Sequence, residues 1–388
     1  MRIAIITENF LPKLDGVTRT LARLLEYLQE NQHQALLLGP ESGMEHYAGA
    51  EIVGTAGVPL PFYPELKFNF FRPLFMRRLI DFDADIIHLV DPIFLGTVGL
   101  GTAKLMKKPV VSSFHTNIPA YCGYFGFPQL TKPMWSYYRA LHSQCALTFC
   151  PSPSMAAMLQ KHGFQNLRIW SRGVDTSLFR PERRNQELRD SWLTGRDRSV
   201  NITVILYVGR VSWEKNLRLL TQAYKGMDHE HCHLVIVGDG PALKEVQHEV
   251  ASLPVTFTGY LKGEQLARAY ASADIFAFPS TTETFGQVVL EAMASGLPVV
   301  GVYSEGVCDL VQHERTGLLL DADRLDEDAQ AHGYLTHLQR LVHNAPERLA
   351  MGQGALKEAS QRSWSEAMAS LLDGYREVVE ARIPLMAA

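Results

Sequence analysis

Short runs of apolar residues recur along the chain, each followed by a turn and a stretch with helical spacing. A bounded apolar run of about 4–8 residues predicts a strand buried on both faces, as in a parallel sheet covered by helices. In the first half these predicted strands are 3–6, 35–38, 86–89, 110–113 and 147–150. In the second half they are 203–208, 234–237, 255–258, 275–278 and 298–302. The alternation predicts an α/β fold of two doubly wound units.

A break in this rhythm divides the chain. Residues 181–200 are rich in Arg, Glu and Asp and contain no strand-like run, so we expect a linker there. It would separate a first domain over 1–180 from a second over 201–362. Apolar residues recur at helical spacing within 363–388, which predicts a C-terminal helix packing across the domains. A length of 388 residues also exceeds what one hydrophobic core usually supports.

The composition excludes several classes of protein. A net charge of -4 and a pI near 6.4 argue against a nucleic acid partner. The five cysteines show no C-x-x-C spacing, so neither a disulfide framework nor a zinc site is expected, and a reducing compartment fits best. The N-terminus reads as a buried strand rather than a signal peptide, and no apolar window reaches about 18 residues. We expect a cytoplasmic protein, either free or on the cytoplasmic face of a membrane.

One segment of the second half combines two carboxylates with an apolar helix. The helix is expected to begin near Phe285 and to end at Gly296, which suits a left-handed cap. Glu283 precedes it and Glu291 lies inside it. The free N–H groups of its first turn would offer a phosphate site beside Glu283. On spacing alone, an ordinary amphipathic helix with two surface carboxylates is the more common explanation.

Two strand ends in the same half carry residues suited to a diphosphate. Arg210 and Lys215 follow the strand over 203–208, where Gly209 would let the backbone approach a ligand closely. The next strand ends at Gly238 and Asp239. Ligands of open parallel sheets collect beyond the carboxyl ends of the strands, so these loops are candidate pocket walls. Solvated loop cations and an ordinary glycine turn are the alternatives.

Candidate positions also occur in the first half. Gly16 precedes a helix expected over 18–29 and would let its N-terminus approach a phosphate, although a cap and turn explain it equally well. His115 follows a strand, where a polar side chain would face a ligand, although a lone histidine is more often structural. Tyr121 and Tyr124 would either line an acceptor groove or fill the core.

Two familiar nucleotide motifs are missing. The sequence has no complete G-x-G-x-x-G fingerprint followed by a ribose-binding acid, which disfavours a dinucleotide dehydrogenase. It also has no G-x-x-x-x-G-K-[ST] run, which disfavours a P-loop hydrolase.

Taken together, these residues resemble the family 4 retaining glycosyltransferases, whose GT-B fold has two facing Rossmann-like domains with a cleft between them. The resemblance covers nearly the whole chain. It implies that the donor sugar and diphosphate are held by Glu283 and by the backbone at Thr284, Phe285 and Gly286. It further implies that Glu291 accepts hydrogen bonds from the ribose hydroxyls. The resemblance thus identifies a nucleotide diphosphate sugar as the donor.

The resemblance also assigns the remaining roles. Arg210 and Lys215 would stabilise the departing diphosphate, and His115 would touch the donor sugar beside the reacting centre. Gly16 would give room for the phosphate and acceptor, with Gly209, Gly238 and Asp239 completing the donor site. The family typically needs no metal, so we expect neither metal nor separate cofactor. Retention is generally described as front-face substitution, in which the leaving phosphate helps to deprotonate the acceptor hydroxyl.

Three stretches are similar to one branch of the family, namely 132–142, 151–152 and 170–175. This branch contains sulfoquinovosyldiacylglycerol synthase and bacterial mannosyltransferases that act on glucuronosyl diacylglycerol, and both act on membrane lipids. Arg172 lies in the last of these stretches, and we expect it to bind the acceptor together with Tyr121 and Tyr124. One departure is Glu305, where the family usually has a Gly-Gly pair, so a carboxylate would lie near the donor. The identity of the donor sugar therefore stays open, and an anionic sulfonated sugar is the donor that this carboxylate disfavours most.

A lipid acceptor gains support from residues 67–78, which mix aromatic and basic side chains as an interfacial segment would. An aromatic core helix with solvated cations is the alternative. We therefore expect a retaining, metal-independent hexosyltransferase that acts on a glycerolipid at a membrane surface. The alternatives are a soluble acceptor, such as a sugar phosphate, inositol or small metabolite, and a noncatalytic nucleotide-sugar-binding protein. The nucleotide base, the hexose and the oligomeric state stay open.

Overall fold

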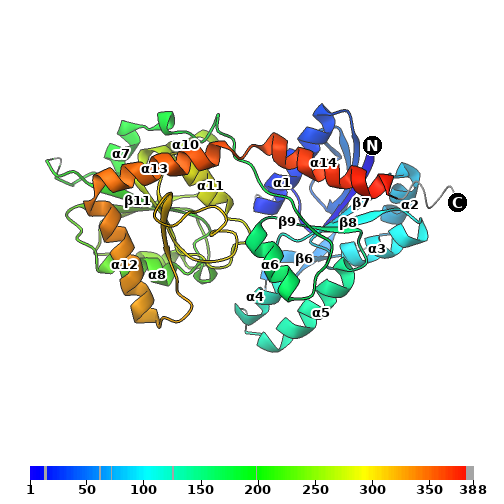
Figure 1. Ribbon diagram of the computed structural model, residues 1–388, viewed down its shortest axis with the longest axis horizontal. Helices are drawn as coiled ribbons and strands as arrows, with labels where there is room; N and C mark the ends of the chain where they lie inside the picture. The colour runs from blue at the N-terminus through cyan, green and yellow to red at the C-terminus, as the bar shows by residue number, and fades with distance from the viewer. Residues whose placement is uncertain (13–14, 61–62, 71, 125, 198, 382–388) are drawn as a thin grey trace. The chain divides into compact units, whose positions relative to one another are not determined.

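The computed structural model describes the chain apart from residues 13–14, 61–62, 71, 125, 198 and 382–388, and it contains two compact α/β units (Figure 1). The first unit comprises Met1–Arg172 and Trp364–Ala388, and the second comprises Gly173–Ser363. The last helix, α14 (Trp364–Glu380), therefore belongs to the first unit although the chain reaches it from the second.

The segment expected to be a linker, 181–200, is instead part of the second unit. It contains a short 3-10 helix, η2 (Pro181–Arg183), and the helix α7 (Gln186–Trp192). Trp192 is buried in the core of that unit, and the Arg189 guanidinium lies 2.7 Å from the Asp274 carboxylate. The segment looked like a solvated linker because of its charged residues. Some of these, such as Arg189, form ion pairs with the rest of the second unit.

The first unit is built on an eight-stranded sheet. The strand order is β10-β9-β8-β7-β1-β2-β4-β3, and all pairs are parallel except β3 with β4. The bounds are β1 (Arg2–Thr7), β2 (Gln34–Pro40), β3 (His46–Tyr47), β4 (Ala50–Thr55), β7 (Ile86–Val90), β8 (Val110–Ser113), β9 (Leu147–Cys150) and β10 (Leu167–Ile169). A separate antiparallel hairpin joins β5 (Gly57–Leu60) and β6 (Tyr63–Asn69). All five strands predicted for this half are confirmed.

Helices cover both faces of this sheet. On one face, α1 (Gly16–Glu30) lies beside α14, and their leucines share a core with β1 (Figure 1). On the other face, α2 (Pro73–Phe82) and α3 (Leu95–Leu105) pack with the opposite side chains of β1. The remaining helices are α4 (Ile118–Tyr124), η1 (Pro128–Leu130), α5 (Thr131–His142) and α6 (Pro153–Lys161). The helix predicted over 18–29 is confirmed as α1, whose N-cap Asp15 accepts the Thr18 N–H at 2.9 Å.

The second unit has a six-stranded, fully parallel sheet in the order β13-β12-β11-β14-β15-β16. Its strands are β11 (Thr203–Val208), β12 (Cys232–Val237), β13 (Val255–Gly259), β14 (Ile275–Phe278), β15 (Val299–Val302) and β16 (Gly317–Leu320). The five strands predicted here are confirmed, and β16 is an addition. The fold is therefore the predicted pair of doubly wound α/β units.

Two helical layers enclose the second sheet. One contains α7, α10 (Gly263–Ser272), α11 (Gln287–Ala294) and α13 (Ala345–Ser360), and the other contains α8 (Leu217–Lys225), α9 (Leu243–Glu249) and α12 (Glu327–His343). A 3-10 helix, η3 (Trp213–Lys215), precedes α8. Strand order reverses between β11 and β14 here, and between β1 and β7 in the first unit. Ligands of open α/β sheets bind at such switch points, which directs attention to the loops after these strands.

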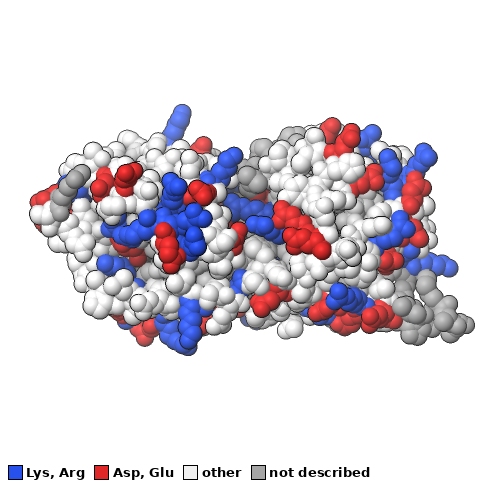
Figure 2. All heavy atoms as spheres, turned by 90° about the horizontal axis from the view of Figure 1, so that it is seen from above, with Lys and Arg blue, Asp and Glu red and all other residues white. Residues whose placement is uncertain are grey.

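The described part of the chain contains no helix with the length and apolar character needed to cross a bilayer. On the face shown in Figure 2, acidic and basic side chains are intermixed rather than gathered into one continuous basic surface, in keeping with the net charge of -4.

Candidate active site

Lys215 and Glu283 form an ion pair at the carboxyl edge of the second sheet. Lys215 ends η3, after β11, and Glu283 lies in the loop between β14 and α11. The Lys215 Nζ atom lies 2.6 Å from Glu283 Oε1, and the side chains are 19% and 23% exposed. Because β11 and β14 are neighbours in the sheet, residues 68 positions apart in sequence meet here. Because the pair is partly buried, water and salt screen its attraction less than that of a fully exposed pair.

The loop after β11 carries a second charged pair. The Arg210 Nη1 atom lies 3.6 Å from Glu214 Oε1, which also accepts a hydrogen bond from the Ser212 hydroxyl at 2.6 Å. The buried Tyr207 hydroxyl donates to the Arg210 carbonyl at 2.9 Å and ties the loop to the strand. Two cations, each held beside a carboxylate, are therefore anchored at one strand end. An incoming diphosphate would compete with these carboxylates for the cations.

The glycine turn after β12 fits closely against the same loop. Gly238 has a φ of +138°, and a Cβ atom there would lie 1.9 Å from the Gly209 carbonyl oxygen. The Val211 N–H donates to the Asp239 carbonyl at 2.9 Å. Only glycine is compatible with this contact. The two loops are thus interlocked through their backbones, which explains the glycines by packing, while their predicted role in donor binding stays a prediction.

The predicted helix between the two glutamates is confirmed as α11. Gly286 is its N-cap residue with a φ of +90°, so the chain turns sharply just after Glu283 and Thr284. Phe285 is buried in the core of this unit. Glu291 is only 2% exposed and accepts a hydrogen bond from the Tyr270 hydroxyl at 3.2 Å. Its predicted contact with ribose would have to coexist with, or replace, that internal bond.

In the first unit, His115 and Arg172 lie together beyond the carboxyl end of β8. Each side chain is 6% exposed, and Arg172 Nη2 donates to His115 Nδ1. Arg172 Nη1 also donates to the Trp170 carbonyl at 3.1 Å, and the guanidinium carbon lies 4.7 Å from the Trp170 ring centroid. Burial lowers the pKa of Arg172 to about 9 and that of His115 well below its usual value. Burial thus favours the neutral form of the His115 imidazole.

Sequence reasoning missed two buried carboxylates of this unit. Asp91, directly after β7, accepts hydrogen bonds from the backbone N–H of His115 at 2.6 Å and from the Thr116 hydroxyl at 2.7 Å. Burial raises the pKa of Asp91 to about 6 despite these bonds. Glu8, after β1, accepts the Phe94 N–H at 2.7 Å near the start of α3. Both acids directly follow apolar strand runs, and that position was a usable sequence signal.

The other predicted positions of the first unit are placed as follows. Gly16 is exposed at the first position of α1, and a Cβ atom there would meet nothing within 4 Å. Tyr121 is half-buried in α4. Tyr124 ends that helix, but its side chain lies outside the described atoms. An acceptor-binding role for these tyrosines stays a prediction.

Comparison with known proteins identifies the family. A family model described as "Glycosyltransferase Family 4" matches residues 14–178, and one described as "Glycosyl transferases group 1" matches residues 202–339. A GDP-mannose-dependent alpha-mannosyltransferase of Corynebacterium glutamicum is 33% identical over 99% of this chain and 91% of its own length. The chain belongs to glycosyltransferase family 4. The resemblance noted from the sequence is thereby confirmed.

Two further comparisons refine this assignment. The sulfoquinovosyl transferase SQD2 of Arabidopsis thaliana is 32% identical over 94% of this glycosyltransferase and 71% of its own length. A crystal structure of Anabaena HepE in complex with UDP and glucose superposes with a TM-score of 0.75 at 17% identity, covering 97% of this chain and all of that one. The structural likeness establishes the GT-B fold, and the relatives support hexosyltransferase activity.

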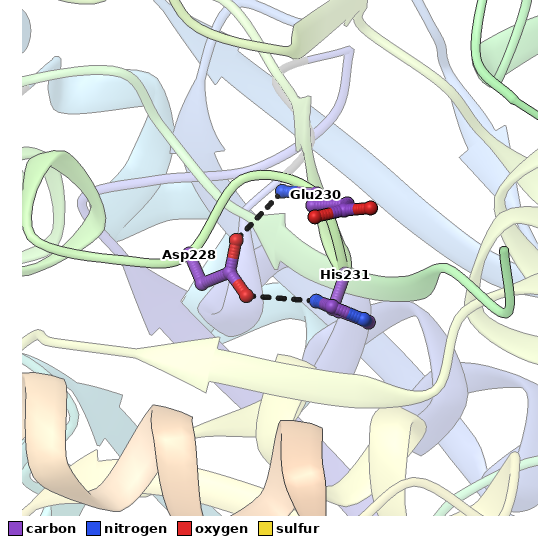
Figure 3. A group of neighbouring side chains, drawn as sticks. All are labelled: Asp228, Glu230 and His231. Carbon is purple, nitrogen blue, oxygen red and sulfur yellow. Dashed lines mark hydrogen bonds and ion pairs between the residues drawn. The ribbon is translucent and has the colours of Figure 1, made fainter.

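One group of possible metal ligands occurs among the described residues of this glycosyltransferase, away from the strand-end loops. Asp228, Glu230 and His231 lie in the turn between α8 and β12 (Figure 3). The Asp228 carboxylate accepts the Glu230 N–H at 3.0 Å and lies 2.7 Å from His231 Nδ1. These bonds within the turn explain why the three side chains are close together. The group gives no ground for assigning a metal.

Proposed function

We propose that this glycosyltransferase moves a neutral hexose from a nucleotide diphosphate sugar to a glycerolipid, with retention and without a metal ion. The observation that carries the donor half of this proposal is the Lys215–Glu283 pair at the switch point of the second sheet, 2.6 Å apart and largely shielded from solvent. Lys215 and Arg210 would take up the negative charge that develops on the departing diphosphate. Glu283 would hold Lys215 in place and accept hydrogen bonds from the sugar hydroxyls.

The choice of a neutral sugar rests on Glu305. Glu305 is exposed and precedes Gly306, where a Cβ atom would lie 2.7 Å from the Phe285 backbone nitrogen. The loop bearing this carboxylate therefore packs directly on the start of the predicted donor site. A sulfonated sugar would be repelled there, whereas sugar hydroxyls would be accepted. GDP-mannose is the first donor to test because the matching corynebacterial protein is GDP-mannose-dependent.

The acceptor half rests on exposed apolar and basic side chains that follow one another along one segment of the first unit. Its apolar members lie between positions 68 and 80 and are Phe68, Phe70, Leu74, Met76 and Ile80, from 36% to 51% exposed. Exposed arginines are interspersed among them, namely Arg72, Arg77 and Arg78. Large apolar side chains mixed with cations are typical of a surface that enters the headgroup region of an anionic membrane. We call residues 68–80 the interfacial segment; residue 71 lies outside the described residues.

Replacing Phe70 and Ile80 together by serine is expected to weaken binding to anionic phospholipid vesicles at least tenfold. These side chains are 47% and 51% exposed, so the free protein gains little from them. In the membrane each would bury its exposed half, worth about 1 kcal/mol. The two together therefore exceed the roughly 1.4 kcal/mol that changes affinity tenfold. Cosedimentation measures the binding. Leu349→Ser, at a 64% exposed leucine of the second unit, is the control and should bind like the unmodified protein.

The same assay separates the alternatives. A glycosyltransferase with a soluble acceptor needs no membrane, so failure of the unmodified protein to bind vesicles would favour a sugar phosphate, inositol or a small metabolite. Equal losses in the double variant and in Leu349→Ser would remove the interfacial segment from the proposal.

A further inference from the structure

A chain of buried hydrogen bonds connects the C-terminal helix to His115. The Tyr375 hydroxyl on α14 lies 2.6 Å from His88 Nδ1, and His88 Nε2 lies 2.8 Å from the Ser113 hydroxyl oxygen. That oxygen lies 2.8 Å from His115 Nε2, and Arg172 Nη2 donates to His115 Nδ1. Five side chains from four segments of the first unit thus form one continuous path.

Every member of this path is shielded from solvent. Tyr375, His88 and Ser113 have no exposed surface, and His115 and Arg172 are 6% exposed. In such surroundings an unpaired polar atom cannot be satisfied by water. Each hydrogen bond therefore constrains the orientation of the side chains on both sides of it.

The guanidinium at one end fixes the protonation of His115. Arg172 can only donate, so Nδ1 of His115 must accept, and the proton of the neutral imidazole lies on Nε2. His115 then donates to the Ser113 hydroxyl. Ser113 is shared between two imidazoles, and His88 is held on its other side by Tyr375. The orientation of His115 thus depends on the orientations of Ser113 and His88, and the Tyr375 hydroxyl fixes that of His88.

The close approach of α14 to the sheet has its own sequence cause. A Cβ atom at Gly374 would lie 2.7 Å from Cζ of Phe149 on β9, so the helix can lie this close only because glycine precedes Tyr375. The packing that brings the helix down on the sheet brings the Tyr375 hydroxyl within hydrogen-bond distance of His88. Figure 1 shows α14 lying across this unit near β7, β8 and β9.

We infer that Tyr375 is a positioning residue for the glycosyl transfer, acting through His88 and Ser113 on the His115–Arg172 pair. The inference rests on the proposed function, together with the role that the family resemblance implies for His115 beside the reacting centre and the role expected for Arg172 at the acceptor. Tyr375 itself touches no substrate in this account. It holds the imidazole of His115 at the orientation that turnover needs, so the last helix of the chain contributes to catalysis as well as to the core.

The test compares Tyr375→Phe with Glu377→Gln on the same helix. The first removes only the hydroxyl, whereas the second weakens an ion pair with Arg168 outside the path. Tyr375→Phe is expected to lower kcat about 10- to 100-fold with the donor KM within about twofold, because small misplacements of reacting groups cost this much. Glu377→Gln should stay within about twofold of the unmodified enzyme. Imidazole ¹⁵N spectra should show altered His115 signals in Tyr375→Phe alone.

A double-mutant cycle separates positioning from loss of stability. If Ser113 lies on the path, Ser113→Ala and Tyr375→Phe remove the same constraint, and the double variant should lose little more kcat than the worse single variant. Multiplied losses, or unchanged His115 signals with a general drop in melting temperature, would overturn the inference. Gly374→Ala keeps the Tyr375 hydroxyl and the His88 imidazole but moves α14 away from β9. It should lower kcat in the same way.

These outcomes are distinct from failure of the proposed function. Full activity of Tyr375→Phe beside an inactive His115→Ala would overturn the inference and leave the function intact. Full activity of His115→Ala would instead contradict the role beside the reacting centre that the family resemblance implies for this histidine.

Discussion

Replacement of Lys215 by alanine is expected to lower kcat by about 10²–10³-fold, the loss typical when one pre-organised group that stabilises developing charge is removed. Lys215 is held 2.6 Å from Glu283 at the end of β11, so its ammonium group is already in place before the diphosphate leaves. The donor KM should change less than kcat, because the interaction strengthens as negative charge develops. Steady-state kinetics with saturating acceptor measures both constants.

Glu283→Ala should abolish transfer altogether, since it removes the sugar contact and releases Lys215 at once. Lys225→Ala provides the matched control. Lys225 also pairs with a glutamate of the second unit, Glu249, at 3.8 Å, but its side chain is 45% exposed and lies outside the strand-end loops. Its loss should leave kcat within about twofold. Unimpaired turnover in Lys215→Ala and Glu283→Ala would remove both residues from the site.

The first unit is expected to lose stability steeply as the pH falls from about 7 to 5. Burial lowers the pKa of His88 and His142 to about 3 and lowers that of His115 well below 6.5. Below about pH 6.5, the pKa of a histidine in the unfolded chain, the unfolded chain therefore binds protons that the folded unit does not bind. The free energy of unfolding then falls with decreasing pH. At pH 5 His88 and His142 each contribute a loss of about 2 kcal/mol, about 4 kcal/mol together, and the lowered pKa of His115 acts in the same direction.

Two buried carboxyls, Asp91 and Glu8, work in the opposite direction because burial raises the pKa of each. Burial raises the pKa of Asp91 from 3.8 to about 6, so the folded unit gains stability as Asp91 is protonated. This gain is only about 1.4 kcal/mol at pH 5, and the histidines dominate. Urea unfolding of the first unit, followed by hydrogen exchange of its core strands, measures the slope. His142→Asn should remove about 2 kcal/mol of the loss. A stability that is flat or rises towards pH 5 would refute this account.

The elements that were predictable from the sequence are those with strong local signals. The central strands of both sheets stand out because they are continuously apolar, and α1 because its leucines recur along one face. The strand β4 was missed because Glu51 and Gly54 interrupt its apolar residues, so the sequence shows no continuous apolar run there. The charges of α7 concealed Trp192, which anchors that segment to the second unit.

The site was predictable only as a set of strand ends. Glu283 and Lys215 each carried a local signal, but their contact spans 68 positions and follows from the adjacency of β11 and β14. The bond between His88 and Tyr375 spans 287 positions and depends on how closely α14 packs on β9. Local pattern cannot encode such contacts, because they arise from tertiary packing. A histidine inside a buried strand, as His88 is, was nevertheless a sign that a buried partner was required.

The central claim is transfer of a neutral hexose from a nucleotide diphosphate sugar to a glycerolipid. The most direct measurement incubates the purified protein with vesicles containing diacylglycerol or its glycosyl derivatives and with GDP-mannose, UDP-glucose or another sugar nucleotide labelled in the hexose. The account predicts label in the lipid fraction with one class of donor, in the presence of a chelator, and with the anomeric configuration of the donor retained. Label that passes only to water-soluble acceptors, or no consumption of any donor, would contradict it.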